Sequence, residues 1–240
     1  MKCNLCGCSE FVDMNSRKAI KCKNCGSLER TRLLWLYIER LPLNSNSRVL
    51  HLAPEKGIYT RLSEKLAAHN YITADYDPGR YAFVERCNKI DLTNMEDWPS
   101  NYFDLILHVH VMEHIPCNIA YPLFHLHRMM KRDGVHLCVI PFLGGVYDEC
   151  FDNMSAGERT RRFGQYDHVR KFGRDGLSTH LGKIINLPTK FDATDDFSES
   201  VLSEANIPKS HWKGFHVGTV LSLKKDDYKL NLRLPASGTF

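Results

Sequence analysis

From residue 48 onward, short apolar runs alternate with segments that carry an apolar residue every three or four positions. Runs of the first kind predict strands, and segments of the second kind predict helices. The expected strands are 49–52, 71–75, 89–91, 102–108 and 135–140, and the expected helices are 58–68 and 118–131. This alternation favours an α/β fold with a doubly wound, mostly parallel sheet, in which ligands bind beyond the carboxyl ends of the strands.

The pattern changes on either side of this region. Residues 28–41 predict a helix with one apolar face, followed by a polar linker. Residues 141–175 predict a long polar connection, 176–182 a helix and 216–223 a late strand. We therefore expect a metal-binding ribbon, a connecting helix with its linker, an α/β domain and a loose tail, at 1–27, 28–47, 48–225 and 226–240.

Two cysteine pairs stand near the start of the chain, separated by fifteen residues: Cys3-x-x-Cys6 and Cys22-x-x-Cys25. Each pair can sit on a tight turn that aims two sulfur atoms at one point, and a glycine follows each pair, where such a turn needs positive φ. Four thiolates in tetrahedral array select Zn²⁺. The spacing therefore predicts a structural zinc site.

Two alternatives stay open at this site. Cys8 could replace Cys6 as a ligand, and a rubredoxin-type iron could replace zinc. A four-thiolate site has no open position for substrate, so we expect it to stabilise the ribbon and not to catalyse.

Charge and hydropathy limit the partners. The formal net charge is +4, and residues 1–48 hold nine Lys or Arg against four Asp or Glu. This mild basicity permits an acidic partner but lacks the basic stripe of a dedicated nucleic-acid binder. No apolar run approaches the ~20 residues of a membrane span. No signal peptide is evident either, so we expect a cytoplasmic protein without a membrane partner.

The loop after the first expected strand, 51–57, has a single glycine, Gly57. A dinucleotide site would need Gly-x-Gly-x-x-Gly there to approach a pyrophosphate, so such a cofactor is disfavoured. Asp75 ends the second strand, where a carboxylate can accept hydrogen bonds from a ribose diol. Asp91 ends the third, in a place suited to an adenine amino group.

The fourth strand ends in a histidine-rich segment, from His108 through His110 to Glu113 and His114. Histidine is the commonest metal ligand, which makes a second metal site one interpretation. The spacing His-Glu-x-x-His is absent, however. We therefore interpret the segment as a loop that lines the cofactor and substrate pocket.

These segments together resemble successive motifs of class I S-adenosylmethionine-dependent methyltransferases. The resemblance rests on 49–55, Ala74-Asp75, 91–93, 103–106 and 110–115. Two further stretches, 25–36 and 163–175, are similar to a bacterial family of zinc-ribbon methyltransferases associated with glycan and natural-product gene clusters. The resemblance implies S-adenosylmethionine as cofactor. Its binding residues would be His51, Ala53, Pro54, Glu55, Gly57, Asp75, Asp91, Leu92 and His108.

Methyl transfer to oxygen or nitrogen can need a base, and histidine suits this role near neutral pH. We expect His168 as the general base, with His110 as the alternative. Substrate binding is assigned to Arg30, Glu113, Gln165 and Arg170.

The expected acceptor is a small molecule, a sugar or a natural product, with O-methylation preferred over N-methylation. One alternative is an RNA methyltransferase that grips nucleic acid with its basic ribbon. Another is a non-catalytic zinc-ribbon interaction module on a methyltransferase scaffold. A dehydrogenase is disfavoured by the missing glycines.

Overall fold

The computed structural model describes residues 1–230, and a six-stranded sheet of order β11-β7-β6-β3-β4-β5 forms its centre. Five strands are parallel and β11 at the edge runs antiparallel. The strands are β3 (Val49–Leu52), β4 (Tyr71–Asp75), β5 (Cys87–Lys89), β6 (Phe103–Val109), β7 (Met130–Val139) and β11 (Val220–Lys224). The expected α/β class with a mostly parallel sheet is confirmed.

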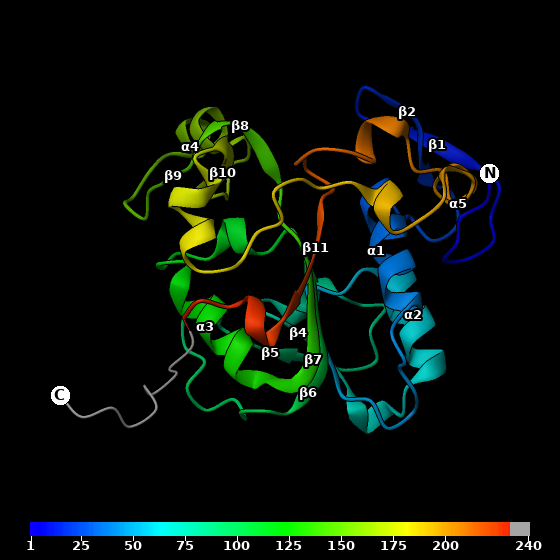
Figure 1. Cartoon of the computed structure of the whole chain (residues 1–240), viewed down its shortest axis with the longest axis horizontal. Helices are drawn as coiled ribbons and strands as arrows, with labels where there is room; N and C mark the ends of the chain where they lie inside the picture. The colour runs from blue at the N-terminus through cyan, green and yellow to red at the C-terminus, as the bar shows by residue number, and fades with distance from the viewer. Residues whose placement is uncertain (231–240) are drawn as a thin grey trace.

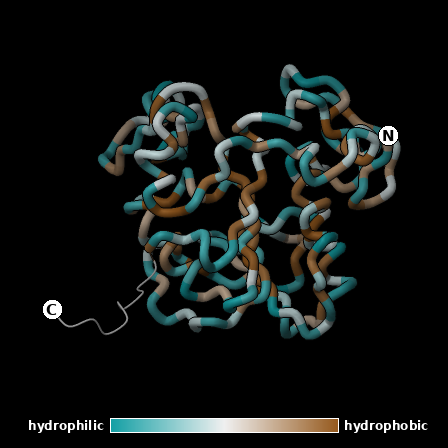
Figure 2. Tube along the Cα trace, in the orientation of Figure 1, coloured by the Kyte–Doolittle hydropathy of each residue, from teal (hydrophilic) through white to brown (hydrophobic). Residues whose placement is uncertain are grey.

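Helices cover both faces of this sheet (Figure 1). On one face, α1 (Glu29–Glu39) and α2 (Lys56–Lys65) pack over a cluster that includes Leu105 and Leu107. On the other, α3 (Ala120–Met129) covers a second cluster that includes Ile106. Successive residues of β6 thus face opposite sides, as the period of two in a strand requires. Figure 2 shows the apolar strands at the centre of the molecule and polar segments around them.

Two smaller layers lie beyond the carboxyl ends of the strands, on opposite sides of the molecule (Figure 1). One is the N-terminal hairpin of β1 (Phe11–Met14) and β2 (Arg17–Cys22), beside α5 (Glu199–Glu204). The other is a three-stranded sheet of order β8-β10-β9 with one helix. Its elements are β8 (Phe142–Val146), β9 (Asp148–Glu149), α4 (Ala156–Phe163) and β10 (Arg170–Asp175).

Three expectations need correction. Residues 141–175 form this second sheet and not a plain connection, and 176–182 form two 3-10 turns, Leu177–Thr179 and Leu181–Lys183, instead of an α-helix. The expected loose tail begins with a buried Tyr228, whereas residues 231–240 lie outside the described part of the chain. No helix within residues 1–230 has the length and apolar character needed to cross a membrane.

The N-terminal hairpin is part of the main core and not a separate knob. Cys3, Leu5 and Cys22 belong to the same buried cluster as the residues of α1 and β6. Arg32 of α1 is fully buried, and its guanidinium donates to four backbone carbonyls, those of Ile20, Ser27, Ala205 and Asn206. This one side chain therefore joins the hairpin to the segment after α5.

Candidate functional site

The four N-terminal cysteines converge on one point. The Sγ atoms of Cys3 and Cys25 are 3.6 Å apart, and those of Cys6 and Cys22 are 3.5 Å apart. A tetrahedral site with Zn–S bonds of about 2.3 Å has sulfur atoms separated by about 3.8 Å, so the cluster is compatible with a zinc ribbon. Both glycines that follow the pairs have φ of 74°. Cys8 stands outside the cluster, where its sulfur accepts from the backbone N–H of Glu10.

Gly57 lies against this ribbon. A Cβ atom at Gly57 would stand 3.2 Å from Leu5 Cδ1 and 3.5 Å from Cys25 Sγ. The missing side chain therefore lets the first turn of α2 pack closely on the cysteine cluster. This packing accounts for the glycine that sequence analysis assigned to the cofactor.

A buried histidine side chain holds the turn after β3 in place. Ala53 adopts φ of 49°, which reverses the chain sharply after the strand. The imidazole of His51 is fully buried, with Nδ1 2.7 Å from the Tyr71 hydroxyl and Nε2 3.2 Å from Glu55 Oε2. His51 thus positions the loop that carries Pro54 and Glu55, and its own ring is not open to a ligand.

Acidic residues follow the next two strands at the same edge of the sheet. Asp75 is the last residue of β4, and its carboxylate accepts from the backbone N–H of Asp77 and from the Tyr81 hydroxyl, both at 2.8 Å. Asp91 follows β5, and its Oδ1 accepts from the N–H and the hydroxyl of Thr93. Both carboxylates are partly exposed. They are the groups at this edge best placed to meet a ligand.

His108 does not reach that edge. Its ring is fully buried on the α3 side of the sheet, 5.0 Å from the ring of His136, and neither ring nitrogen has a hydrogen-bond partner among residues 1–230. Burial holds its pKa well below the usual value, so the ring is neutral. Its place in the core does not suit the cofactor contact expected from the sequence.

Four titratable side chains lie close together at the turn after β6: His110, Glu113, His114 and His168. Glu113 is 1% exposed, and burial raises its pKa to about 8. His114 and His168 lie beside it with ring centroids 4.7 Å apart. His110, at φ of 54°, approaches Glu113 Oε1 to 3.6 Å with its Nδ1. Burial lowers the pKa of His110 to about 3, which makes it a weak base.

Backbone contacts bring His168 to this place from a distant part of the chain. The N–H of Val169 donates to the carbonyl of Glu113 at 2.9 Å. Arg170 is fully buried and donates to the carbonyls of Met112 and Cys117 and to Glu149. Its donors are therefore used to position the turn at 112–117, which is a different role from the substrate contact expected from the sequence.

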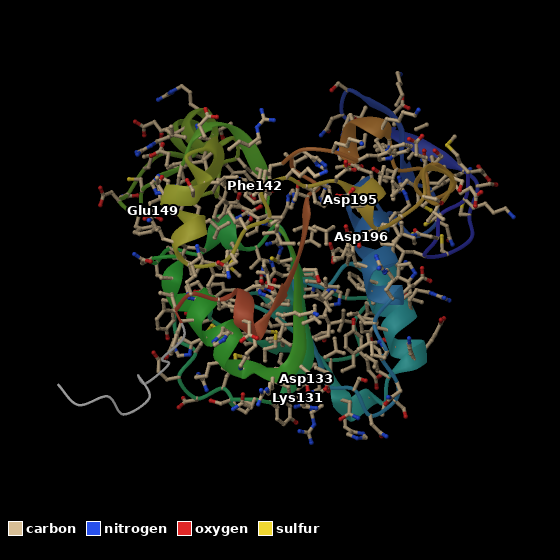
Figure 3. The ribbon with its side chains drawn as sticks, viewed as in Figure 1. Lys131, Asp133, Phe142, Glu149, Asp195 and Asp196 are labelled. Carbon is tan, nitrogen blue, oxygen red and sulfur yellow. The ribbon has the colours of Figure 1, made fainter. Side chains whose placement is uncertain are left out.

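Figure 3 shows Glu149 on the side of the β8–β10 layer, and Lys131 and Asp133 at the opposite end of the sheet. That opposite end holds the pair of Lys131 Nζ and Asp104, at 2.8 Å. This ion pair lies at the amino ends of β6 and β7, whereas Asp75, Asp91 and Glu113 lie at or beyond the carboxyl ends of their strands.

Two other expected substrate residues also lie at the strand-end edge. Arg30 of α1 interacts electrostatically with Glu55, Glu29 and Glu113, and its buried Nε has no partner among the described residues. Gln165 is exposed and donates its amide to Asp167 Oδ1 at 2.8 Å.

Sequence reasoning missed two partners. Tyr81 orients Asp75, and Asp167 contacts His114 at 3.4 Å and not its sequence neighbour His168. Tyr81 lies outside the stretches that carry the resemblance, and Asp167 lies within 163–175 without a role assigned to it. Only the proximity of Asp167 to a histidine could have drawn attention to it.

No protein-family model and no curated protein sequence matches the chain. Among solved structures, it is similar to the YcgJ protein of Bacillus subtilis, with 16% identity, 74% of this chain and 79% of that chain covered, and a TM-score of 0.43. A chain from the Haloferax volcanii complex of the methyltransferase activator Trm112 is 12% identical, with 78% and 86% covered and a TM-score of 0.46.

A third solved structure, an S-adenosylmethionine-dependent methyltransferase from Mesorhizobium loti, is 16% identical, with 51% of this chain and 55% of that chain covered and a TM-score of 0.36. At such identities these likenesses concern the fold alone.

Proposed function

We propose that the protein is an S-adenosylmethionine-dependent methyltransferase whose cofactor lies across the carboxyl ends of β3, β4 and β5. One observation carries this proposal: Asp75 and Asp91 follow adjacent parallel strands at one edge of the sheet. Ligands of such sheets bind at this edge. The loop after β3 offers no glycine-rich cradle for a pyrophosphate, which favours an adenosine cofactor without phosphate.

The two carboxylates fit an adenosine because they retain free lone pairs. An ionised carboxylate has about four acceptor sites. Asp75 uses one on each oxygen, for Asp77 and Tyr81, and both oxygens can still accept from a ribose diol. Asp91 uses only Oδ1, for Thr93, and its Oδ2 can accept from the adenine amino group. Leu92 is buried beside Asp91 and offers apolar support for the adenine ring.

One acidic and one basic side chain, Glu55 and Arg30, are available to bind the methionine end of the cofactor. Glu55 can meet the amino group and the sulfonium, and Arg30 can meet the carboxylate, because the Arg30 guanidinium already interacts with Glu55. When bound, the cofactor supplies a methyl group on a positively charged sulfur. The protein then has to bring the acceptor atom into line with the carbon–sulfur bond.

We place the acceptor at the turn after β6, beside Glu113, His114 and His168. These groups can handle the proton of a hydroxyl, which supports an oxygen acceptor on a small molecule or sugar. Sequence analysis assigned the base to His168. The structure-based support for His110 in that role is weaker, because its Nε2 is 2.7 Å from the Val217 carbonyl and its pKa is low.

Calorimetric titration with S-adenosylmethionine tests the proposal. We expect binding by the native chain and a roughly 10- to 100-fold weaker affinity for Asp75→Ala, since hydrogen bonds to a charged group contribute about 1.5–3 kcal/mol. Asp77→Ala is the matched control, because its exposed side chain lies in the same turn while its backbone N–H still supports Asp75. No binding by the native chain would reject the function. Equal weakening in both variants would reject only the role of Asp75.

A further inference from the structure

We propose that Glu113, His114 and His168 form a divalent transition-metal site that binds the hydroxyl groups of the methyl acceptor. The inference rests on the proposed methyl transfer and names the acceptor's chemistry. One ligand atom from each residue lies within 4.8 Å of the others. Two imidazoles and one carboxylate are a donor set typical of divalent transition ions that keep positions open for substrate.

The buried carboxylate of Glu113 gives the first argument. Neither of its oxygens has a hydrogen-bond partner among residues 1–230, although the side chain is 1% exposed. Buried polar atoms are nearly always paired, and an unpaired one calls for an explanation such as a bound ion. The Nδ1 atom of His110 lies 3.6 Å from Glu113 Oε1, which is beyond hydrogen-bond distance, and the Nε2 atom of the same ring pairs with the Val217 carbonyl at 2.7 Å.

Cationic side chains do not satisfy Glu113 either. The charges of Arg30 and Arg170 act on it, but the Arg170 donors are directed to Met112, Cys117 and Glu149. Arg30 makes no hydrogen bond to Glu113 in the described structure. The two oxygens thus have no donor among residues 1–230, and a cation shared with His114 and His168 would complete their coordination.

The two histidines are oriented by outer partners, as metal-bound imidazoles generally are. His168 Nδ1 is 3.2 Å from the Phe163 carbonyl, so this nitrogen carries the hydrogen and Nε2 keeps its lone pair. His114 Nδ1 lies 3.4 Å from Asp167 Oδ2, and Gln165 holds the other Asp167 oxygen at 2.8 Å. In each ring the Nε2 atom is therefore the nitrogen left for a metal ion.

The site is open on one side. Glu113 is buried, whereas the His114 side chain is 30% exposed and His168 is partly exposed. Three protein ligands leave positions for substrate oxygen atoms. Two adjacent hydroxyls, as in the vicinal diol of a sugar, can fill two such positions at once. The acceptor class we infer is therefore a vicinal diol.

A cation here also changes the base chemistry. A divalent ion lowers the pKa of a coordinated hydroxyl group, so its proton can pass to water at the exposed side. The oxygen then forms a bond to the methyl carbon, the carbon–sulfur bond breaks, and its electron pair stays on sulfur. In this scheme His168 is a ligand of the ion. This role replaces the general-base role expected from the sequence.

Titration of the zinc-loaded chain with Mn²⁺, followed by the loss of the free-ion electron paramagnetic resonance signal, tests the site without any methyl transfer. We expect one Mn²⁺ per chain. Glu113→Gln and His168→Ala should each weaken its affinity at least ~10-fold, and the positioning residue variant Asp167→Asn should weaken it by roughly 10- to 100-fold. His69→Ala, an exposed histidine at the opposite end of β4, should leave it unchanged.

The same samples are titrated with S-adenosylmethionine, which separates the two proposals. A native chain that binds S-adenosylmethionine but no Mn²⁺ would overturn the metal site and leave the function standing. Mn²⁺ binding that is equal in the native chain, Glu113→Gln and His168→Ala would also overturn it. Near-ultraviolet circular dichroism that matches the native chain confirms that each variant is folded.

Discussion

Two groups of side chains that could hold a metal ion have opposite character. The four N-terminal cysteines are close in sequence, sit on two tight turns and belong to the main core. Glu113, His114 and His168 come from two distant segments, and two of the three are partly exposed. The first arrangement is closed and suits a structural ion, whereas the second is open and suits a substrate. Local spacing predicts the first kind of site, but only tertiary contacts assemble the second.

Removal of zinc should have the largest effect, because structural zinc contributes an apparent 10–16 kcal/mol, roughly, to small metal domains. Cys22→Ser, or a strong chelator, should unfold the ribbon and lower the melting temperature of the whole chain, since Cys22 belongs to the main core. Calorimetric melting with metal analysis measures both. Cys8→Ser is the control, and its loss of zinc would contradict the assigned ligand set.

The open site should behave differently when its ion is removed. Dialysis that removes Mn²⁺ from the Glu113 cluster and leaves zinc bound should leave the melting temperature nearly unchanged, because the turn at 112–117 is also held by backbone contacts such as that of the Val169 N–H with the Glu113 carbonyl. Melting that falls as steeply as after zinc loss would remove the distinction between the two regions.

After zinc removal, loss of the Arg32 guanidinium should cause the next largest loss of stability. Arg32→Met removes the guanidinium donors from the carbonyls of Ile20, Ala205 and Asn206, whereas the Ser27 carbonyl still accepts from the Cys22 N–H. The loss should lower the free energy of unfolding by about 3–5 kcal/mol. Urea unfolding measures this change. Arg40→Met, just after the same helix, removes an exposed pair with Asp196 and a contact over the Phe197 ring, and should cost less than about 1 kcal/mol. Similar losses for both would show that the ribbon is not joined to the core through Arg32.

Gly57→Ala should have a smaller effect on stability than Arg32→Met. Gly57→Ala places a Cβ 3.2 Å from Leu5 Cδ1 and should lower the free energy of unfolding by about 1 kcal/mol, with no change in S-adenosylmethionine affinity. Gly157→Ala is the control, since its Cβ would meet open space within α4. A Gly57→Ala chain of native stability but weak cofactor binding would restore the cofactor role expected from the sequence.

Local pattern predicted much of the fold. The strands at 49–52 and 71–75 have the expected bounds, because short apolar runs between polar turns specify buried parallel strands. Residues 141–175 were misjudged because β8, β9 and β10 pair across long loops and carry many polar residues. The expected helix at 176–182 is interrupted at His180, whose φ of −118° and ψ of −96° are not helical.

The candidate site was predictable only in part. Asp75 and Asp91 could be placed from strand ends alone, since parallel strands end at one edge. Arg170 and His108 could not, because their burial depends on partners far away in the sequence. An arginine within a basic stretch looks exposed until its carbonyl acceptors are known. Similarly, a histidine near a strand end gives no sign of which face it occupies.

A crystal structure of the chain grown with zinc, Mn²⁺ and S-adenosylhomocysteine, with anomalous diffraction at the manganese edge, would reveal whether strand-end carboxylates hold an adenosine beside an open metal site. We expect the ribose on Asp75, the adenine by Asp91 and a manganese peak at Glu113, His114 and His168. A nucleoside bound elsewhere, with Asp75 free of it, would show that the strand-end carboxylates do not bind the cofactor.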